Sequence, residues 1–194
     1  MKIVIASNNA KKRREIEKIL STLNISVVSA EETQCIDVIE DGETFAENAK
    51  KKAEAFSIAN KLPALADDSG LCVAALADAP GVFSSRYAGE NASDAENNAK
   101  LLEAMKGIEN RTAHFVCSLC LVFPDGQASV TAEGNVNGYI LSEPDGAEGF
   151  GYDPLFHSLD LHKSFAVADA KEKASVSHRG RALRSFAEKL AQFV

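Results

Sequence analysis

The chain has 194 residues, of which 45% are apolar and 25% charged, a composition typical of a soluble globular protein. The formal net charge is −7, whereas proteins that bind duplex nucleic acid usually carry an excess of basic residues, so we expect no nucleic-acid partner. No apolar run reaches the length of a signal peptide or a membrane span, so we expect no membrane association and one α/β domain over residues 1–194.

The four cysteines of the chain indicate whether its compartment is oxidising or reducing. They are Cys35, Cys72, Cys117 and Cys120. The last two form a C-x-x-C motif inside residues 113–123, an apolar run that predicts a strand. An odd separation places the two thiols on opposite faces of a strand, where they share neither a metal nor a disulfide. We therefore predict free thiols in a reducing compartment, the cytoplasm.

The first third of the chain alternates between predicted strands and helices. Residues 2–6 predict a buried strand, and the turn Ser7-Asn8-Asn9 leads into a helix whose apolar side chains recur at helical spacing. Residues 25–29 predict a second strand. Thr44-Phe45-Ala46-Glu47 has the pattern of a capping box and predicts the start of a second helix.

Turns, a third helix and a hairpin are predicted next. Leu62 to Ala66 predicts a strand that ends at Asp67-Asp68, with Ser69-Gly70 as a turn. Residues 71–76 predict another strand and 93–105 a helix. Strands over 113–123 and 127–136 are joined by Pro124-Asp125-Gly126, a hairpin signal. After a glycine-rich loop (142–153) comes a final helix, so the order predicts a mixed, twisted α/β sheet flanked by helices.

Positively charged side chains gather at two predicted helix starts. A helix N-terminus is already partly positive, so each added cation costs a few tenths to about 1 kcal/mol unless an anion binds there. The pattern indicates a phosphate site, although a solvated basic run would look the same. The residues are Lys11, Lys12, Arg13 and Arg14 at the first helix and His178, Arg179 and Arg181 at the last, with Lys171 and Lys173 just upstream.

Carboxylates suited to magnesium follow the predicted strand. Mg²⁺ prefers one or two carboxylates together with phosphates and waters. Asp67 and Asp68 are adjacent on an extended chain, so only one of them faces a pocket unless the turn has already begun. Glu40 and Asp41 could complete the metal shell. A turn-capping aspartate and a solvent-exposed acidic turn are the structural alternatives.

Two further groups suggest a nucleotide. Asn48 and Lys52 share a helix face, where an amide and an ammonium could bind a phosphate oxygen, although Lys52 could equally be a surface lysine. Phe150 and Tyr152 flank Gly151, and rings beside glycine can stack on a planar base. The alternative is a tight turn whose aromatic side chains fill the core.

Together, these segments resemble the inosine/xanthosine triphosphate pyrophosphatases, also called HAM1-like proteins. The order and spacing of the matching motifs agree with that family over almost the whole chain. The motifs are residues 7–12 (SNNAKK), 44–49 (TFAENA), 66–70 (ADDSG), 79–89 (APGVFSSRYAG), 149–154 (GFGYDP) and 177–180 (SHRG).

The resemblance implies Mg²⁺-dependent hydrolysis of ITP, dITP and XTP to the monophosphate and pyrophosphate, in a homodimer with two lobes and a central nucleotide cleft. It implies that Asp68 accepts a proton and binds the metal. With it we expect Glu40 as the second metal ligand, and Lys12 and Lys52 as the residues that stabilise charge when pyrophosphate departs. The implied substrate contacts are Ser69, the phosphate-side loop of Ser7, Asn8, Asn9, Ala10, Lys11 and Lys12, and, chiefly around the base, Phe150, Gly151, Tyr152, Asp153, Lys173, His178 and Arg179.

Three positions depart from the family pattern. Ser7-Asn8 replace the common Thr-Gly, which keeps the hydroxyl but loses the conformational freedom of glycine. Ile39 replaces the first of two glutamates before Gly42, which leaves Glu40 as the metal candidate. Lys171 stands where an acidic residue is common.

Two other functions would use the same residues. A nucleotide sensor would bind without turnover, and a phosphatase would release orthophosphate rather than pyrophosphate. The identity of the product separates the two enzymes, and absence of turnover would indicate the sensor.

Overall fold

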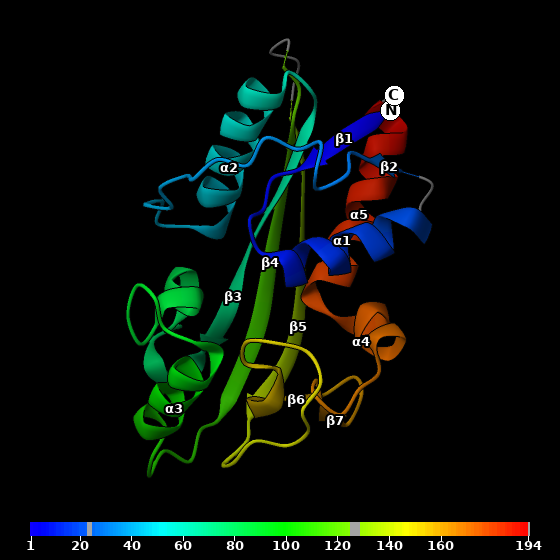
Figure 1. The fold of residues 1–194 in the computed structure, drawn as a ribbon. Helices are drawn as coiled ribbons and strands as arrows, with labels where there is room; N and C mark the ends of the chain where they lie inside the picture. Colours follow the sequence, from blue (N-terminus) through cyan, green and yellow to red (C-terminus); the bar gives the residue numbers. More distant parts are fainter. Residues whose placement is uncertain (23–24, 125–128, 194) are drawn as a thin grey trace. The chain divides into compact units, whose positions relative to one another are not determined.

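A computed structural model of the protein describes residues 1–22, 25–124 and 129–193 (Figure 1). Part of the predicted hairpin turn, from Asp125 onward, lies outside the described residues. None of the described helices is long and apolar enough to cross a bilayer. The elements are β1 (Lys2–Ile5), α1 (Ala10–Thr22), β2 (Ser26–Val27), α2 (Phe45–Asn60), β3 (Ala64–Val73), η1 (Ala74–Leu76), η2 (Gly81–Arg86), α3 (Asp94–Ala104), β4 (Thr112–Val122), β5 (Val130–Ile140), η3 (Asp153–Leu155), β6 (Phe156–Ser158), β7 (Lys163–Ser164), α4 (Ala170–Val176) and α5 (His178–Phe193).

The described strands form one mixed sheet in the order β2-β1-β3-β4-β5-β6-β7. β1 runs parallel to both β2 and β3, with Val4 opposite Ala64. β6 runs antiparallel to β5 and β7, with Gly138 opposite Ser158. The predicted mixed α/β sheet is therefore confirmed.

The chain divides into two compact units. The first comprises residues 1–68, 117–134 and 179–194, and the second residues 69–116 and 135–178. β3, β4 and β5 each contribute residues to both units.

Side-chain alternation along the strands builds the core of the first unit. Ile3 and Ile5 of β1 belong to a cluster with side chains of α1 and α5, whereas Val4 packs with side chains of α2. The helices thus cover two faces of the strands, as Figure 1 shows, with α1 beside α5. Cys117 lies in the first cluster and Cys120 in the second, which confirms that the two thiols point to opposite faces.

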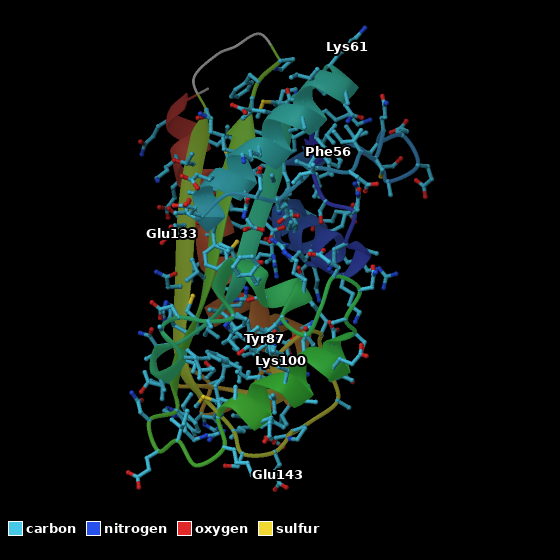
Figure 2. All side chains as sticks on the ribbon, turned by 90° about the vertical axis from the view of Figure 1, so that its left-hand side faces the viewer. Phe56, Lys61, Tyr87, Lys100, Glu133 and Glu143 are labelled. Carbon is cyan, nitrogen blue, oxygen red and sulfur yellow. The ribbon has the colours of Figure 1, made fainter. Side chains whose placement is uncertain are left out.

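The core of the second unit is aromatic. The ring of Phe115 lies 4.7 Å from that of Phe156, and the Phe156 and Phe165 rings are 5.1 Å apart. Tyr87 and Lys100, labelled in Figure 2, form a cation–π pair at 4.5 Å beside this core.

Local signals predicted the starts of α1, α2, α3 and α5 correctly, but they missed α4 and predicted one turn wrongly. α2 begins with the predicted capping box of Thr44 and Glu47. It ends at Asn60, and the next residue, Lys61, labelled in Figure 2, caps it with a left-handed backbone whose φ is 54°. The predicted turn at Ser69-Gly70 does not form. β3 lies between β1 and β4, and its pairing with neighbouring strands carries it through both residues to Val73. The predicted strand 71–76 is therefore the end of β3 followed by η1.

Candidate active site

Two groups of the predicted site residues form clusters, one in each unit. In the first unit, β3 places Asp67 and Asp68 next to each other with their side chains on opposite faces, as the extended backbone requires. Asp68 faces α2, and Asp67 faces the starts of α1 and α5.

Asp68, Glu40 and Lys52 form a compact charged cluster. The Nζ atom of Lys52 lies 2.8 Å from Oδ1 of Asp68 and 3.1 Å from Oε2 of Glu40. Lys52 is buried on the face of α2 that packs on the sheet, so it is not a surface lysine. Asp41, next to Glu40, is exposed and pairs instead with Lys51.

The two carboxyl groups of this cluster titrate differently. Burial and the hydrogen bond with Glu40 raise the pKa of Asp68 to about 6, although Lys52 and Lys12 oppose the shift. Burial also opposes ionisation of Glu40, but the attraction of Lys52 outweighs it and lowers the pKa of Glu40. The pKa of Lys52 is raised despite burial, because Asp68, Asp67 and Glu40 favour its ammonium form. Below pH 6, the pair of carboxyls therefore retains one proton, chiefly on Asp68.

The position of Asn48 on its helix face predicts an amide that could bind a phosphate oxygen. The structure shows instead that this amide is bound within the protein. The Asn48 side chain is 0% exposed. The Oδ1 atom accepts a hydrogen bond from the backbone N–H of Gly42 at 2.8 Å, and Nδ2 donates to Gly42 O and to Asp68 Oδ2, each at 3.4 Å. The amide is committed to the protein itself, so only Lys52 of this predicted pair keeps a possible phosphate role.

On the other face of β3, Asp67 lies in a buried ion-pair network. Arg179 donates to Asp67 Oδ2 from Nη2 at 2.8 Å and from Nε at 3.3 Å, and Lys12 Nζ lies 3.7 Å away. Burial works against the charge of Asp67, but Lys12 and Arg179 hold its pKa far below the usual range. Arg179, only 1% exposed, also pairs with Glu15 of α1, a partner that sequence reasoning missed.

The start of α1 is built by the predicted Ser7-Asn8-Asn9 turn. Asn9 Oδ1 accepts hydrogen bonds from the backbone N–H groups of Lys11 and Lys12, at 3.0 and 3.1 Å, and so caps the helix. Asn8 lacks a left-handed φ, so its replacement of glycine brings no strain. The side-chain amide of Asn8 donates to Ile36 O at 3.0 Å.

The basic run at this helix start serves more than one purpose. Asn8, Asn9, Ala10 and Lys11 are exposed, whereas Lys12 turns toward Asp67. Arg13 is buried and donates to the backbone oxygens of Ile5 and Val28, a structural role that the anion-site interpretation did not foresee.

In the second unit, the glycine-flanked aromatic motif surrounds a buried ion pair. Asp153 Oδ2 accepts hydrogen bonds from the backbone N–H of Phe150 at 2.8 Å and from Lys173 Nζ at 2.7 Å. The same Nζ lies 4.9 Å from the centre of the Phe150 ring. Gly149 has a φ of +79°, and a Cβ there would meet Asp153 Oδ2 at 2.1 Å, so only glycine permits this arrangement.

The remaining predicted residues of the second unit are placed differently. Tyr152 is buried, and its hydroxyl donates to Ser84 O at 2.8 Å, so it fills the core as the structural alternative described. Gly151 is held by α3, since its N–H donates to Asp94 and its oxygen accepts from Asn98, both at 2.9 Å. The His178 ring stacks on Phe115 at 4.7 Å.

Asp68 and Glu40 fit magnesium by their donor chemistry. Within the residues that the structure describes, no three His, Cys, Asp or Glu side chains gather in a metal-binding group. Mg²⁺ does not need such a cage, because it keeps several waters and takes one or two carboxylates plus substrate phosphates. Both carboxylates lie within hydrogen-bond distance of the same Lys52 Nζ atom, at 2.8 and 3.1 Å, so they are placed where one cation could contact both.

Comparisons with known proteins agree with the motifs. Residues 3–189 match the Ham1 family model. A dITP/XTP pyrophosphatase of Syntrophobacter fumaroxidans is 53% identical over 93% of this chain and 78% of that protein, and one of Nitrosomonas europaea is 47% identical over 98% and 95%. The structure of a HAM1 protein from Coxiella burnetii superposes with a TM-score of 0.89 and 43% identity, over 99% of both chains. The chain belongs to the Ham1 family.

Proposed function

We propose that the protein hydrolyses the purine nucleoside triphosphates dITP, XTP and ITP to the monophosphate and pyrophosphate, and so removes them from the nucleotide pool. The cluster of Asp68, Glu40 and Lys52 carries this proposal. It supplies a basic carboxylate, a second carboxylate and a fixed ammonium within hydrogen-bond distance of one another. Support also comes from relatives that match over most of their own length, which are dITP/XTP pyrophosphatases.

Asp68 and Glu40 would hold Mg²⁺, as the resemblance implies. When bound, the ion supplies neutralisation of the triphosphate charge and lowers the pKa of a coordinated water. Asp68 would accept the proton of the water that attacks the α-phosphorus. A pKa raised to about 6 suits it for this role, since a general base works best with a pKa near the operating pH.

Lys52 and Lys12 would stabilise the negative charge that grows on the departing pyrophosphate. Lys52 is fixed by two carboxylates, so little reorganisation is needed when the charge develops. The loop from Ser7 to Lys12 would contact the phosphates with its exposed polar groups, and Ser69 would contact the substrate next to Asp68.

Recognition of the base would fall to residues of the second unit. The Phe150 ring offers a stacking surface, and Lys173 and His178 are potential hydrogen-bond donors to the 6-keto oxygen of the purine. Adenine carries an amino group at this position, so these donors would lose about 1–3 kcal/mol of pairing. For Arg179 we propose a positioning role through Asp67 in place of direct contact with the base, because its guanidinium is buried in ion pairs.

A homodimer in the cytoplasm completes the proposal, on the strength of the family resemblance. Light scattering coupled to size-exclusion chromatography would give twice the chain mass of 20.7 kDa for a dimer. A mass equal to one chain would contradict the dimer and leave the proposed chemistry unaffected.

A product assay tests the proposed reaction. We expect Mg²⁺-dependent release of pyrophosphate from dITP, XTP and ITP, little from ATP or GTP, and loss of turnover in Asp68→Asn. Asp145→Asn is the matched control, because Asp145 is exposed and lies outside the proposed site. Orthophosphate as the product would identify a phosphatase, and binding without turnover would identify a nucleotide sensor.

A further inference from the structure

The proposed metal ligand Glu40 lies on a long irregular segment. Residues 28–44, between β2 and α2, contain no assigned helix or strand. A carboxylate on such a segment loses conformational freedom when it binds a metal, unless other contacts already hold the backbone in place.

Two asparagines of α2 hold this segment in the same way at two points. Asn60 accepts from the N–H of Gln34 at 2.8 Å and donates to its carbonyl oxygen at 3.2 Å. Asn48 accepts from the N–H of Gly42 at 2.8 Å and donates to its carbonyl oxygen at 3.4 Å. Each side-chain amide thus pairs with both backbone polar groups of one residue, as a neighbouring strand would.

Only the Asn48 contact reaches the charged cluster. Gly42 lies two residues after Glu40, and Nδ2 of Asn48 also lies 3.4 Å from Oδ2 of Asp68. One buried amide therefore contacts both the segment that carries Glu40 and the side chain of Asp68. Asn60, at the other end of α2, contacts Gln34 and the backbone of Phe56 instead.

Glycine at position 42 is part of this contact. A Cβ on Gly42 would lie 2.7 Å from Oδ1 of Asn48 and 2.9 Å from Cβ of Glu47. A methyl group there would push the segment away from α2 or displace the amide, since the Glu47 carbon belongs to the helix and has little room to move.

We propose that Asn48 is a positioning residue for the metal site, which holds the segment at Gly42 so that the Glu40 carboxylate stays beside Asp68. This inference rests on the proposed role of Glu40 and Asp68 as metal ligands. Residues that orient metal ligands typically contribute 10- to 100-fold to metal affinity, so we expect about that loss when Asn48 is truncated.

Direct metal binding tests the inference without relying on activity. Mn²⁺, a paramagnetic substitute for Mg²⁺, is titrated into each purified variant and free Mn²⁺ is followed by electron paramagnetic resonance. We expect Mn²⁺ to bind about 10- to 100-fold more weakly to Asn48→Ala. Gly42→Ala should also weaken Mn²⁺ binding, although it keeps asparagine at position 48. It therefore provides a second test if Asn48→Ala folds poorly.

Asn60→Ala is the matched control. It removes the same pair of backbone hydrogen bonds from the same segment and helix, yet it leaves the charged cluster untouched. We expect wild-type Mn²⁺ affinity for this variant. Turnover by Asn48→Ala should also recover when Mg²⁺ is raised in proportion to the lost affinity, which a general folding defect would not allow.

The outcomes separate the inference from the function on which it rests. Wild-type Mn²⁺ affinity in both Asn48→Ala and Gly42→Ala would overturn the positioning role, as would an equal loss in Asn60→Ala. Glu40→Gln shows whether the ligand itself is correct. If Glu40→Gln weakens Mn²⁺ binding and the two positioning variants do not, only the inference fails; if Glu40→Gln has no effect, the proposed metal site fails with it.

Discussion

The buried pair of Arg179 and Asp67 allows a quantitative prediction for Arg179→Met. The substitution removes the cation that contacts Asp67 Oδ2 at 2.8 and 3.3 Å and leaves the aspartate buried, with Lys12 Nζ at 3.7 Å. The methionine keeps much of the side-chain volume, so loss of charge pairing rather than a cavity dominates the effect.

Removing one partner of a buried ion pair costs about 3–5 kcal/mol, because an uncompensated charge stays behind. For a chain of this size, each kcal/mol of unfolding free energy that is lost lowers Tm by about 2–4 °C, so Tm should fall by about 6–20 °C at pH 7. The loss should also depend on pH. Because the wild-type pKa of Asp67 is depressed, the pair stabilises the fold above the unfolded value of about 3.9 and loses this contribution as the pH falls.

In Arg179→Met the pKa of Asp67 is higher than in wild type, so lowering the pH reduces the unfolding free energy of the variant less. The difference in Tm between wild type and variant therefore becomes smaller below about pH 4. Thermal unfolding at pH 7 and at pH 3.5 measures both effects. Arg14→Met is the control, since Arg14 is exposed on the same helix as Lys12 and should change stability by no more than about 0.5 kcal/mol. A Tm at pH 7 that matches wild type, or a difference that is the same at both pH values, would refute the reasoning.

Three further predictions concern the two clusters. Lys52→Met should lower kcat for dITP by about 10²–10³-fold in the pyrophosphate assay, whereas Lys51→Met, at an exposed position on the same helix, should leave it unchanged; equal effects would contradict the charge-stabilising role. Mg²⁺ affinity measured by calorimetry should rise with pH up to about 6 and then level off, because metal and proton compete for Asp68; a flat profile from pH 5 to 7 would contradict this competition. Asp153→Asn should raise KM for dITP by about 5- to 150-fold, since it loosens Lys173; an unchanged KM would separate this pair from base binding.

The sequence was informative wherever the controlling interactions are local. The capping box of Thr44 and Glu47 determined the start of α2, and helical spacing then placed Asn48 and Lys52 on one face. The alternation of side chains along a strand likewise predicted that Asp67 and Asp68 point in opposite directions. Each of these expectations depends on residues within four positions of one another.

Long-range pairing explains what the sequence could not reveal. Ser69-Gly70 is a good local turn signal, but β3 continues through both residues to Val73 as a strand of the sheet. The local sequence places Arg179 in a basic helix start, whereas its partner Asp67 lies 112 positions earlier in the chain. No local pattern distinguishes an arginine that awaits a ligand from one that already has a buried carboxylate.

The different behaviour of two adjacent aspartates follows from the cations on each side of β3. Asp67 pairs with Arg179 and lies 3.7 Å from Lys12, and these cations outweigh its burial and depress its pKa. Asp68 contacts Lys52, which also contacts the carboxylate of Glu40. Burial and the neighbouring Glu40 outweigh the attraction of Lys52 and Lys12, so the pKa of Asp68 is raised to about 6. At neutral pH Asp68 is therefore mostly ionised beside a second carboxylate, and this pair favours the divalent cation that we propose there.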